Sequence, residues 1–446
     1  MVDTYSKLKL FKEILKKQKK DPRFLSSEPP VCLCGVYGTK AQLDVVEDEC
    51  SNVIKQDKTY ADAYVALARI HATSGRYKDA DAEIKKAISI NPDFSDANFA
   101  AGDISFQLER FDEAEVYIKN SIKKQPKFAN AYIVLGRIYY SQEKLDLAEI
   151  AFKKAISLRP GYADAHLGLA GVYVGLGKLN EAEDEHKKAI AINSHYAEAR
   201  TGLGWLYYLR GALKNAEKEF QKAAILTPQE YEIYTGLGWI NYKLNRYDEA
   251  EADFLKAKSI KKNNIDSFVG LGWTYFRMYL LAESQLEAAD KEFKTAVKLD
   301  PKYGDAYLGL GWVCFHQDKL DDSEKNFLKA LELNPDSAEP HLGLGWVYYK
   351  LIDTKKELIK DAEKEFKLSA ELAPDMPEVY VGLGWVKYQM SKLAEAKKHF
   401  KKARELNSNY ADALIGLATV YEKEGRKIEA KEIFRKAKKI SPKGAF

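Results

Sequence analysis

A pattern of 34 residues returns along most of this chain. Counted from Ala61, it occurs eleven times and ends at residue 444; nine copies have 34 residues, and two, 265–303 and 338–376, have 39. A unit this short cannot bury its own apolar face, so it folds only when it is stacked on neighbours. The 446 residues therefore predict one array of similar repeats, although length alone suggests about three independent domains.

Small side chains mark fixed places in every repeat. Place eight is Gly or Ala, and places twenty and twenty-seven are Ala or Ser, in all eleven copies. Helices approach closely only where side chains are small, and an oversized residue there costs about 1–3 kcal/mol. Eight copies carry Phe at place twenty-four, and eight close with a proline, which ends one helix and permits the next to start. Each copy is therefore expected to form a helix, a turn and a helix, such as Ala131–Ser141 and Leu145–Leu158.

This alternation of small and large residues at a 34-residue period resembles the tetratricopeptide repeat family. The resemblance covers residues 61–444. It implies an all-α, right-handed superhelical solenoid of about 11–12 helix-turn-helix repeats. It also implies that the first helix of each repeat lines a concave groove.

The N-terminal region departs from the pattern. Residues 1–26 predict a basic amphipathic helix that caps the array; contact with an acidic partner or a membrane surface is the alternative. Residues 27–60 look like a degenerate twelfth repeat, with Ala41–Ile54 as its second helix.

The C-terminal end of the array is also unusual. Members of the family usually finish with an extra polar helix, and Ser441–Phe446 are too few residues to form one. Residues 445–446 are interpreted as a tail. We therefore expect a partly bare end surface that favours self-association or partner docking.

Aromatic residues at two places of the first helix are the candidate binding residues. All six tryptophans of the chain occupy place nine, in six consecutive copies, and place twelve of the same copies is Tyr or Phe. Both places share one helix face, which the resemblance assigns to the groove. Such side chains dominate binding hot spots. The candidates are Trp205, Trp239, Trp273, Trp312, Trp346, Trp385, Tyr208, Tyr242, Phe276, Phe315, Tyr349 and Tyr388.

Two other interpretations of the tryptophans stay open. They are copies made by a recent duplication, or each indole packs onto a small residue of the neighbouring repeat, such as Gly236 or Gly270. The upstream copies differ at place nine, where they carry Arg69, Asp103, Arg137 and Gly171.

Place two is acidic in ten of the eleven copies. An acid in the first turn stabilises a helix by about 0.3–1 kcal/mol through the macrodipole. If these acids also rim the groove, they favour a basic or amphipathic ligand. The carboxylate clamp of chaperone-binding family members needs Lys at place five and Asn at place nine; neither occurs here, so that mode of binding is excluded.

The two 39-residue repeats carry insertions between their helices, near Tyr279–Leu286 and Ile352–Ile359. Lengthened helices that pack on each other are one interpretation, and a partner contact is the other.

The sequence contains no recognisable catalytic, metal or cofactor motif. Gly177-Lys178 superficially matches a phosphate-binding loop, but Leu179 replaces the required Ser or Thr, and the position suits a turn. The four cysteines are too scattered for a disulfide framework. The repeat array is near neutral, which argues against nucleic-acid binding. We see no 18-residue apolar run or signal peptide, so we expect no membrane span and a cytoplasmic location.

These patterns favour a non-enzymatic scaffold that binds a protein or peptide segment in an aromatic-lined groove. The alternative is a self-assembling structural protein, a homo-oligomer built by end-to-end or groove packing of the solenoid.

Overall fold

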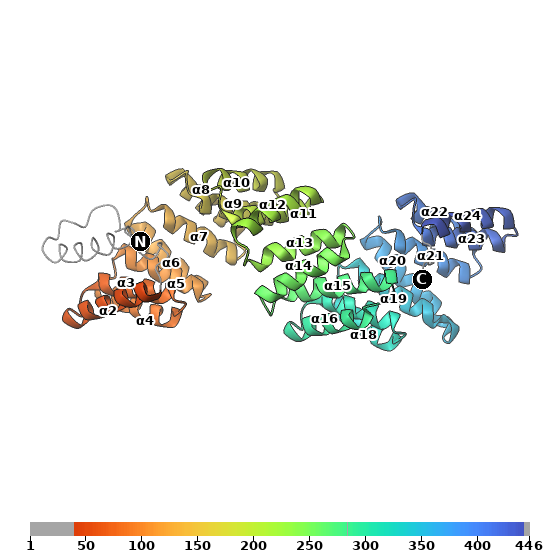
Figure 1. The fold of residues 1–446 in the computed structure, drawn as a ribbon, viewed down its shortest axis with the longest axis horizontal. Helices are drawn as coiled ribbons and strands as arrows, with labels where there is room; N and C mark the ends of the chain where they lie inside the picture. The colour runs from red at the N-terminus through yellow and green to blue at the C-terminus, as the bar shows by residue number, and fades with distance from the viewer. Residues whose placement is uncertain (1–39, 283, 441–446) are drawn as a thin grey trace. The chain divides into compact units, whose positions relative to one another are not determined.

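The computed structural model describes residues 40–282 and 284–440, and all regular secondary structure in those residues is helical. The contacts divide the chain into two compact units, which we call the N-terminal unit (up to Ala212) and the C-terminal unit (from Leu213). Figure 1 shows paired helices stacked within each unit. The predicted all-α, helix-turn-helix solenoid class is confirmed.

The N-terminal unit contains the following described helices: α2 (Lys40–Gln56), α3 (Ala61–Thr73), α4 (Tyr77–Ile90), α5 (Ser95–Gln107), α6 (Phe111–Lys124), α7 (Ala129–Ser141), α8 (Leu145–Leu158), α9 (Ala163–Gly175), α10 (Leu179–Ile192) and α11 (Ala197–Leu209). The two helices expected in repeat 129–162 correspond to α7, which starts two residues earlier than expected, and α8. The predicted helix in residues 1–26 lies outside the described residues.

The C-terminal unit contains α12 (Leu213–Leu226), α13 (Tyr231–Lys243), α14 (Tyr247–Ile260), α15 (Ile265–Ala282), α16 (Leu286–Leu299), α17 (Gly304–His316), α18 (Leu320–Leu333), α19 (Ala338–Lys350), η3 (Leu351–Asp353), η4 (Lys356–Leu358), α20 (Ile359–Leu372), α21 (Pro377–Gln389), α22 (Leu393–Leu406), α23 (Ala411–Lys423) and α24 (Lys427–Ile440). Residues 441–446, including the predicted tail, lie outside the described part.

One residue with a positive φ ends the first helix of most repeats. A left-handed residue after a helix lets its amide group satisfy a free carbonyl of the last turn. Gly177, with a φ of 71°, occupies this place between α9 and α10, so Gly177-Lys178 is a turn, as predicted. Eight other repeats use Gly75, Glu109, Glu143, Gly211, Asn245, Asp318, Ser391 and Gly425.

The two insertions adopt different structures. The first lengthens α15 to 18 residues, against 13 in α13, and leaves Leu280 and Leu281 exposed. The second forms the two short 3₁₀ turns η3 and η4, with Ile352 buried. The expectation of a lengthened helix is therefore right for the first insertion and wrong for the second.

The first and second helices form two layers within each unit. In the N-terminal unit α3, α5, α7, α9 and α11 contact one another in succession, and in the C-terminal unit α13, α15, α17, α19, α21 and α23 do the same. The second helices instead contact chiefly the first helix of their own repeat and that of the next. The first helices are therefore the inner layer of each unit, and we call them the inner helices.

Candidate interaction surface

The six tryptophans lie on inner helices and are half-buried. In five repeats the indole contacts the place-twenty-four phenylalanine of its own repeat edge to face, with ring centroids 5.2–5.3 Å apart. T-shaped aromatic pairs of this kind contribute about 0.5–1.5 kcal/mol beyond their buried area. The indoles concerned are those of Trp239, Trp273, Trp312, Trp346 and Trp385. Part of each indole is therefore anchored in the core, and part remains accessible.

The nearest neighbours of the small glycines Gly236 and Gly270 are phenylalanine rings. A Cβ atom added at Gly236 or Gly270 would come within 2.3–2.4 Å of the rings of Phe220 or Phe254, which are its nearest neighbours. A Cβ at Gly238 would also meet Phe254, at 2.7 Å. The nearest neighbour of these glycines is therefore the buried phenylalanine, which occupies the space between two glycines; the interpretation that each indole packs onto the next repeat's glycine stays a prediction.

The place-twelve aromatics pack against the tryptophans. The rings at places nine and twelve are T-shaped in all six repeats, with centroids 5.6–5.9 Å apart. Phe276 and Phe315 are buried, with 6% and 8% of their surface exposed. The remaining four are half-buried tyrosines: Tyr208, Tyr242, Tyr349 and Tyr388. The second row is therefore only partly accessible, because its two phenylalanines belong to the core.

The place-two acids of the C-terminal unit lie close enough together to influence each other's ionisation. Burial, and then the charge of Asp266, raises the pKa of Asp305. Burial also raises the pKa of Glu339, with further contributions from Asp305 and Glu378. Burial and the charge of Glu378 raise the pKa of Asp412 to about 6. We call these five residues the acidic ladder.

Tyrosine hydroxyls hold some of these acids in place. The Oη atom of Tyr303 donates a hydrogen bond to Oδ1 of Asp266, at 2.6 Å. Tyr196 makes the same bond to Asp164 in the N-terminal unit. In both cases the tyrosine closes one repeat, and the acid belongs to the first turn of that repeat's inner helix. The place-two acids thus have a structural role beyond the helix dipole.

Arg277 is an exposed cation in the same unit as the acidic ladder. It follows Phe276 on α15. Desolvation by itself lowers the pKa of Arg277, but neighbouring groups that include Glu378 raise it above its ordinary value. Glu378 begins α21, three inner helices further along the chain, so the inner layer brings distant repeats within electrostatic range.

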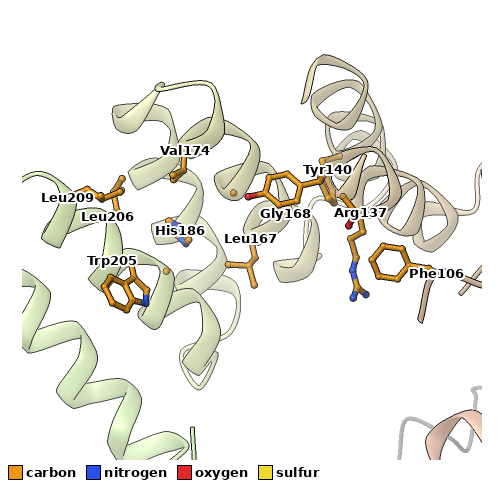
Figure 2. A pocket seen from close by; sticks show the side chains of 14 residues that line it. Phe106, Arg137, Tyr140, Leu167, Gly168, Val174, His186, Trp205, Leu206 and Leu209 are labelled. Carbon is orange, nitrogen blue, oxygen red and sulfur yellow. The ribbon is translucent and has the colours of Figure 1, made fainter. Parts of the chain in front are cut away.

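A cavity of about 420 Å³ opens on the inner helices of the N-terminal unit (Figure 2). It lies where Gly171, on α9, takes the place of a tryptophan. Its floor includes His186, on α10, which stands where most repeats carry phenylalanine and is 3% exposed. The cavity is lined by Phe106, Arg137, Tyr140, Ser141, Phe152, Leu167, Gly168, Gly171, Val174, His186, Gly202, Trp205, Leu206 and Leu209. Gly171 and Arg137 stand out from the tryptophans at place nine in the sequence, but this pattern does not predict a cavity.

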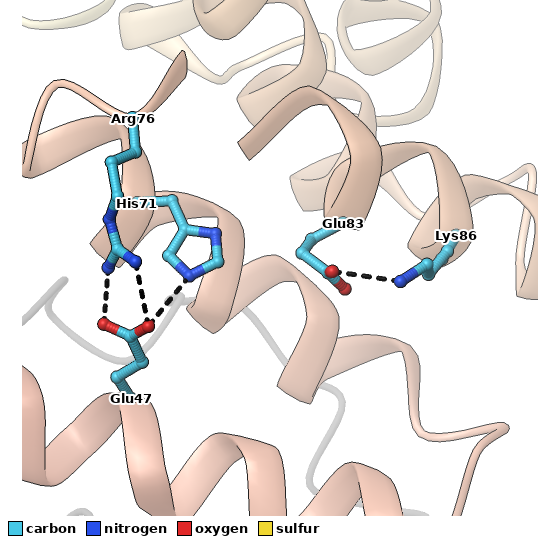
Figure 3. Close-up of polar contacts among 5 residues, drawn as sticks. All are labelled: Glu47, His71, Arg76, Glu83 and Lys86. Carbon is cyan, nitrogen blue, oxygen red and sulfur yellow. Dashed lines mark hydrogen bonds and ion pairs between the residues drawn. The ribbon is translucent and has the colours of Figure 1, made fainter. Parts of the chain in front are cut away.

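Hydrogen bonds and ion pairs between successive repeats were also not predicted from the sequence. In Figure 3 the guanidinium group of Arg76 donates two hydrogen bonds to Glu47 of α2, and Nε2 of His71 lies 3.2 Å from the same carboxylate. Other repeats make the same link, as between Glu115 and Tyr139, 3.2 Å apart. The signal in the sequence is an acid followed by a tyrosine 24 residues later or a basic residue 29 later. Glu47 holds the corresponding place in residues 27–60, whose interpretation as a degenerate repeat stays a prediction.

The described residues contain no group of three His, Cys, Asp or Glu side chains that could hold a metal ion. Cys50 and Cys314 are free and buried, while Cys32 and Cys34 lie outside the described part. No helix in the described part of the chain is long and apolar enough to cross a membrane.

Comparison with known families identifies the repeat. Profiles described as tetratricopeptide repeat match residues 61–94, 99–163, 134–197, 167–231, 231–264, 278–338 and 387–445, which together span most of the chain. The chain belongs to the tetratricopeptide repeat family. No curated protein sequence matches this tetratricopeptide repeat chain.

Solved structures are similar to most of this chain or to part of it. The crystal structure of the APC/C heterotetramer Cut9–Hcn1 matches with a TM-score of 0.54 and 13% identity, over 91% of this chain and 92% of that one. The Pseudomonas aeruginosa protein pilF has a TM-score of 0.42 and 21% identity, over 48% of this chain and 94% of that one. MamA has a TM-score of 0.32 and 25% identity, over 36% and 94%. At 13% identity, the likeness to Cut9–Hcn1 concerns the fold alone.

Proposed function

We propose that this protein is a non-enzymatic scaffold that binds a segment of a partner protein on its aromatic inner helices. Tetratricopeptide repeats generally serve as protein-interaction scaffolds, which is the broad class. The finer proposal assigns anchoring of the segment to the indoles at place nine, helped by the accessible tyrosines at place twelve. The anchors are Trp205, Trp239, Trp273, Trp312, Trp346 and Trp385.

The observation that carries this proposal is the half-buried state of the indoles. The edge contact with a fully buried phenylalanine, such as that of Trp312 with Phe327, restricts the indole before any partner arrives. A side chain that is already ordered loses little conformational entropy on binding, and this favours affinity. Aromatic side chains with a large contact area are also the residues that most often dominate binding energy.

Charge on the inner helices favours an amphipathic, basic segment. The acidic ladder includes Asp266, Asp305 and Glu339 on three successive inner helices of the C-terminal unit. The side chains of all three acids are exposed, so a cation can reach them, and like charges gathered on one face attract it together. The partner segment would place apolar side chains against the indoles and basic side chains against the ladder.

The test uses peptides selected from a random displayed library on the full chain. Selected peptides should be enriched in basic and apolar residues. Changing Trp273 and Trp312 together to Ala should weaken their binding at least tenfold, because two hot-spot side chains are removed. Binding is measured by calorimetry, and folding is followed by circular dichroism on the same samples.

The matched control changes two exposed leucines of the outer helices, Leu255 on α14 and Leu328 on α18, together to Ala. This double variant should bind the selected peptides as the unaltered chain does. Equal binding by the folded tryptophan variant would contradict the proposal. Added salt should weaken binding, and changing Asp305 to Asn with Glu339 to Gln should reduce that salt dependence.

Self-assembly is the second candidate, favoured by the surface of α24. Phe434 on this helix is only half-buried, whereas its counterpart Phe400 is fully buried. Ile428 on the same helix is 80% exposed. If this surface joins two chains, sedimentation velocity should detect an oligomer that Ile428→Glu converts to monomer. A monomer at all concentrations would contradict self-assembly and leave the peptide-binding proposal unaffected.

A further inference from the structure

The cavity of the N-terminal unit lies at the place where other repeats hold an indole. In repeat 231–264, for example, Trp239 at place nine covers Phe254 at place twenty-four, with centroids 5.2 Å apart. In repeat 163–196 both residues differ together: place nine is Gly171 and place twenty-four is His186. Because place nine is glycine, no indole covers the ring at place twenty-four, and Gly171 and His186 both line the resulting cavity.

The cavity is shaped by aromatic and aliphatic walls. Tyr140 from α7 and Trp205 from α11 lie on opposite sides of the cavity in Figure 2, and Leu167 and Val174 extend the apolar lining. A volume of about 420 Å³ falls within the range of roughly 300–1,000 Å³ typical of ligand sites. Such walls favour a flat aromatic ring, because aromatic pairs gain from offset and edge-to-face contacts.

The imidazole of His186 lines the floor of the cavity, and one of its nitrogens has no hydrogen-bond partner among the described residues. Burial lowers the pKa of His186 to about 4, so its imidazole is neutral near pH 7. A neutral imidazole has one nitrogen that accepts a hydrogen bond and one that donates. Nδ1 of His186 is buried, and no hydrogen-bond partner for it exists among the described residues. A buried polar group left unpaired is costly, and the imidazole that carries this atom lines the cavity, so a ligand that forms a hydrogen bond with the imidazole is favoured.

The charge at the rim is already balanced. Arg137 lies over the ring of Phe106, with its guanidinium carbon 4.9 Å from the ring centroid. Arg137 is also close enough to Asp103 to oppose the rise that burial causes in the pKa of that carboxyl group. A charged ligand therefore gains no clear advantage here over a neutral aromatic one.

We propose that this cavity is a pocket for an indole ring, the side chain of a tryptophan in the partner segment. The ring takes the space that a place-nine tryptophan fills in other repeats, and its N–H group donates to the imidazole of His186. The inference rests on the proposed function in one respect, because the indole is supplied by the same partner class. It adds the identity of one anchoring residue on the partner side.

The experiment measures binding of free indole and of benzofuran, which replaces the N–H group with oxygen, to the full chain by calorimetry. Indole should bind about fivefold more tightly than benzofuran, the ratio expected for one hydrogen bond. His186→Phe restores the residue type of most repeats and should bring this ratio close to one.

Gly171→Trp fills the pocket with the chain's own indole. The substitution is sterically feasible, because a Cβ atom at Gly171 has its nearest neighbour, in the ring of Tyr140, at 3.9 Å. We expect this variant to lose at least tenfold in affinity for indole while its melting temperature is maintained or raised. The control Gly171→Ala adds one methyl group and should keep most of the binding.

Two results would overturn the inference: no indole binding by the unaltered chain at millimolar concentrations, or unchanged binding by folded Gly171→Trp. If either result is found but binding of the selected peptides still depends on Trp273 and Trp312, the proposed function holds without the pocket. If the chain binds free indole but does not bind the selected peptides, the pocket holds without the proposed function.

Discussion

The indole of Trp312 contacts the ring of Phe327 edge to face, with the ring centroids 5.3 Å apart. The ring of Phe327 also lies against Gly311 of its own repeat and Gly343 of the next. The fully buried Phe327 therefore joins two repeats and supports a half-buried anchor. Stability and binding are coupled through this ring, and the coupling can be tested at several positions.

Replacing the glycine that receives the ring should destabilise the array. A Cβ atom at Gly270 would lie 2.4 Å from the ring of Phe254, which is enclosed and cannot move away freely. Gly270→Ala should therefore lower the free energy of unfolding by about 1–3 kcal/mol, the range for overpacked cores. Urea denaturation followed by circular dichroism measures the change.

Gly171→Ala is the matched control for that substitution, because its new Cβ atom meets only ordinary van der Waals contacts. Alanine favours a helix over glycine by about 0.5–1 kcal/mol, so this variant should be equal to or more stable than the unaltered chain. A similar loss in both variants would show that tight packing against Phe254 is not the cause.

Removing a central phenylalanine ring should be far more costly than removing a peripheral one. Phe327→Ala leaves a cavity between two repeats and should cost about 3–5 kcal/mol. Phe434, at the same place on α24, is only half-buried, so Phe434→Ala should cost less. Hydrogen exchange should show faster exchange in both repeats that contact Phe327, whereas a loss confined to α18 would contradict the bridging role.

A buried carboxyl group makes stability depend on pH. Nδ2 of Asn241 donates to Asp253 at 2.8 Å, yet burial raises the pKa of Asp253 to about 6. In the unfolded chain the carboxyl group of Asp253 loses its proton near pH 4. The contribution of Asp253 to the free energy of unfolding therefore falls as the pH rises from about 4 to 6 and is then constant. Asp253→Asn should raise the free energy of unfolding at pH 7 by on the order of 1–2 kcal/mol. Denaturation at pH 4, where the gain should vanish, checks the assignment.

His186 should give the opposite dependence. Its pKa is lowered to about 4 by burial, whereas an unfolded histidine titrates near 6.5. The contribution of neutral His186 to the free energy of unfolding is therefore fully present above pH 6.5. It is lost as the pH falls toward 4, by about 2 kcal/mol at pH 5. His186→Phe should remove this loss, and comparison of the two denaturation curves at pH 7 and pH 5 isolates it from other groups. An identical loss in both proteins would exclude His186 as its source.

Much of the architecture could be read from local regularity. Small residues at places eight, twenty and twenty-seven predict close helix packing, and α8 corresponds to the helix expected from Leu145 to Leu158. The second insertion was misjudged, because Ile352 is buried and packs in a 3₁₀ turn that periodicity cannot reveal. The contacts of the indoles could not be predicted for a similar reason: several small and aromatic residues compete for the same space.

The sequence by itself determined the repeat, the paired helices and the family, because a 34-residue period repeated eleven times leaves few other ways to bury apolar residues. Tertiary structure alone decided which ring enters which space. It placed Phe254 between Gly238 and Gly270 and turned Gly171 and His186 into one cavity. These outcomes depend on the distances between neighbouring repeats, and close packing assigns each space to one side chain only.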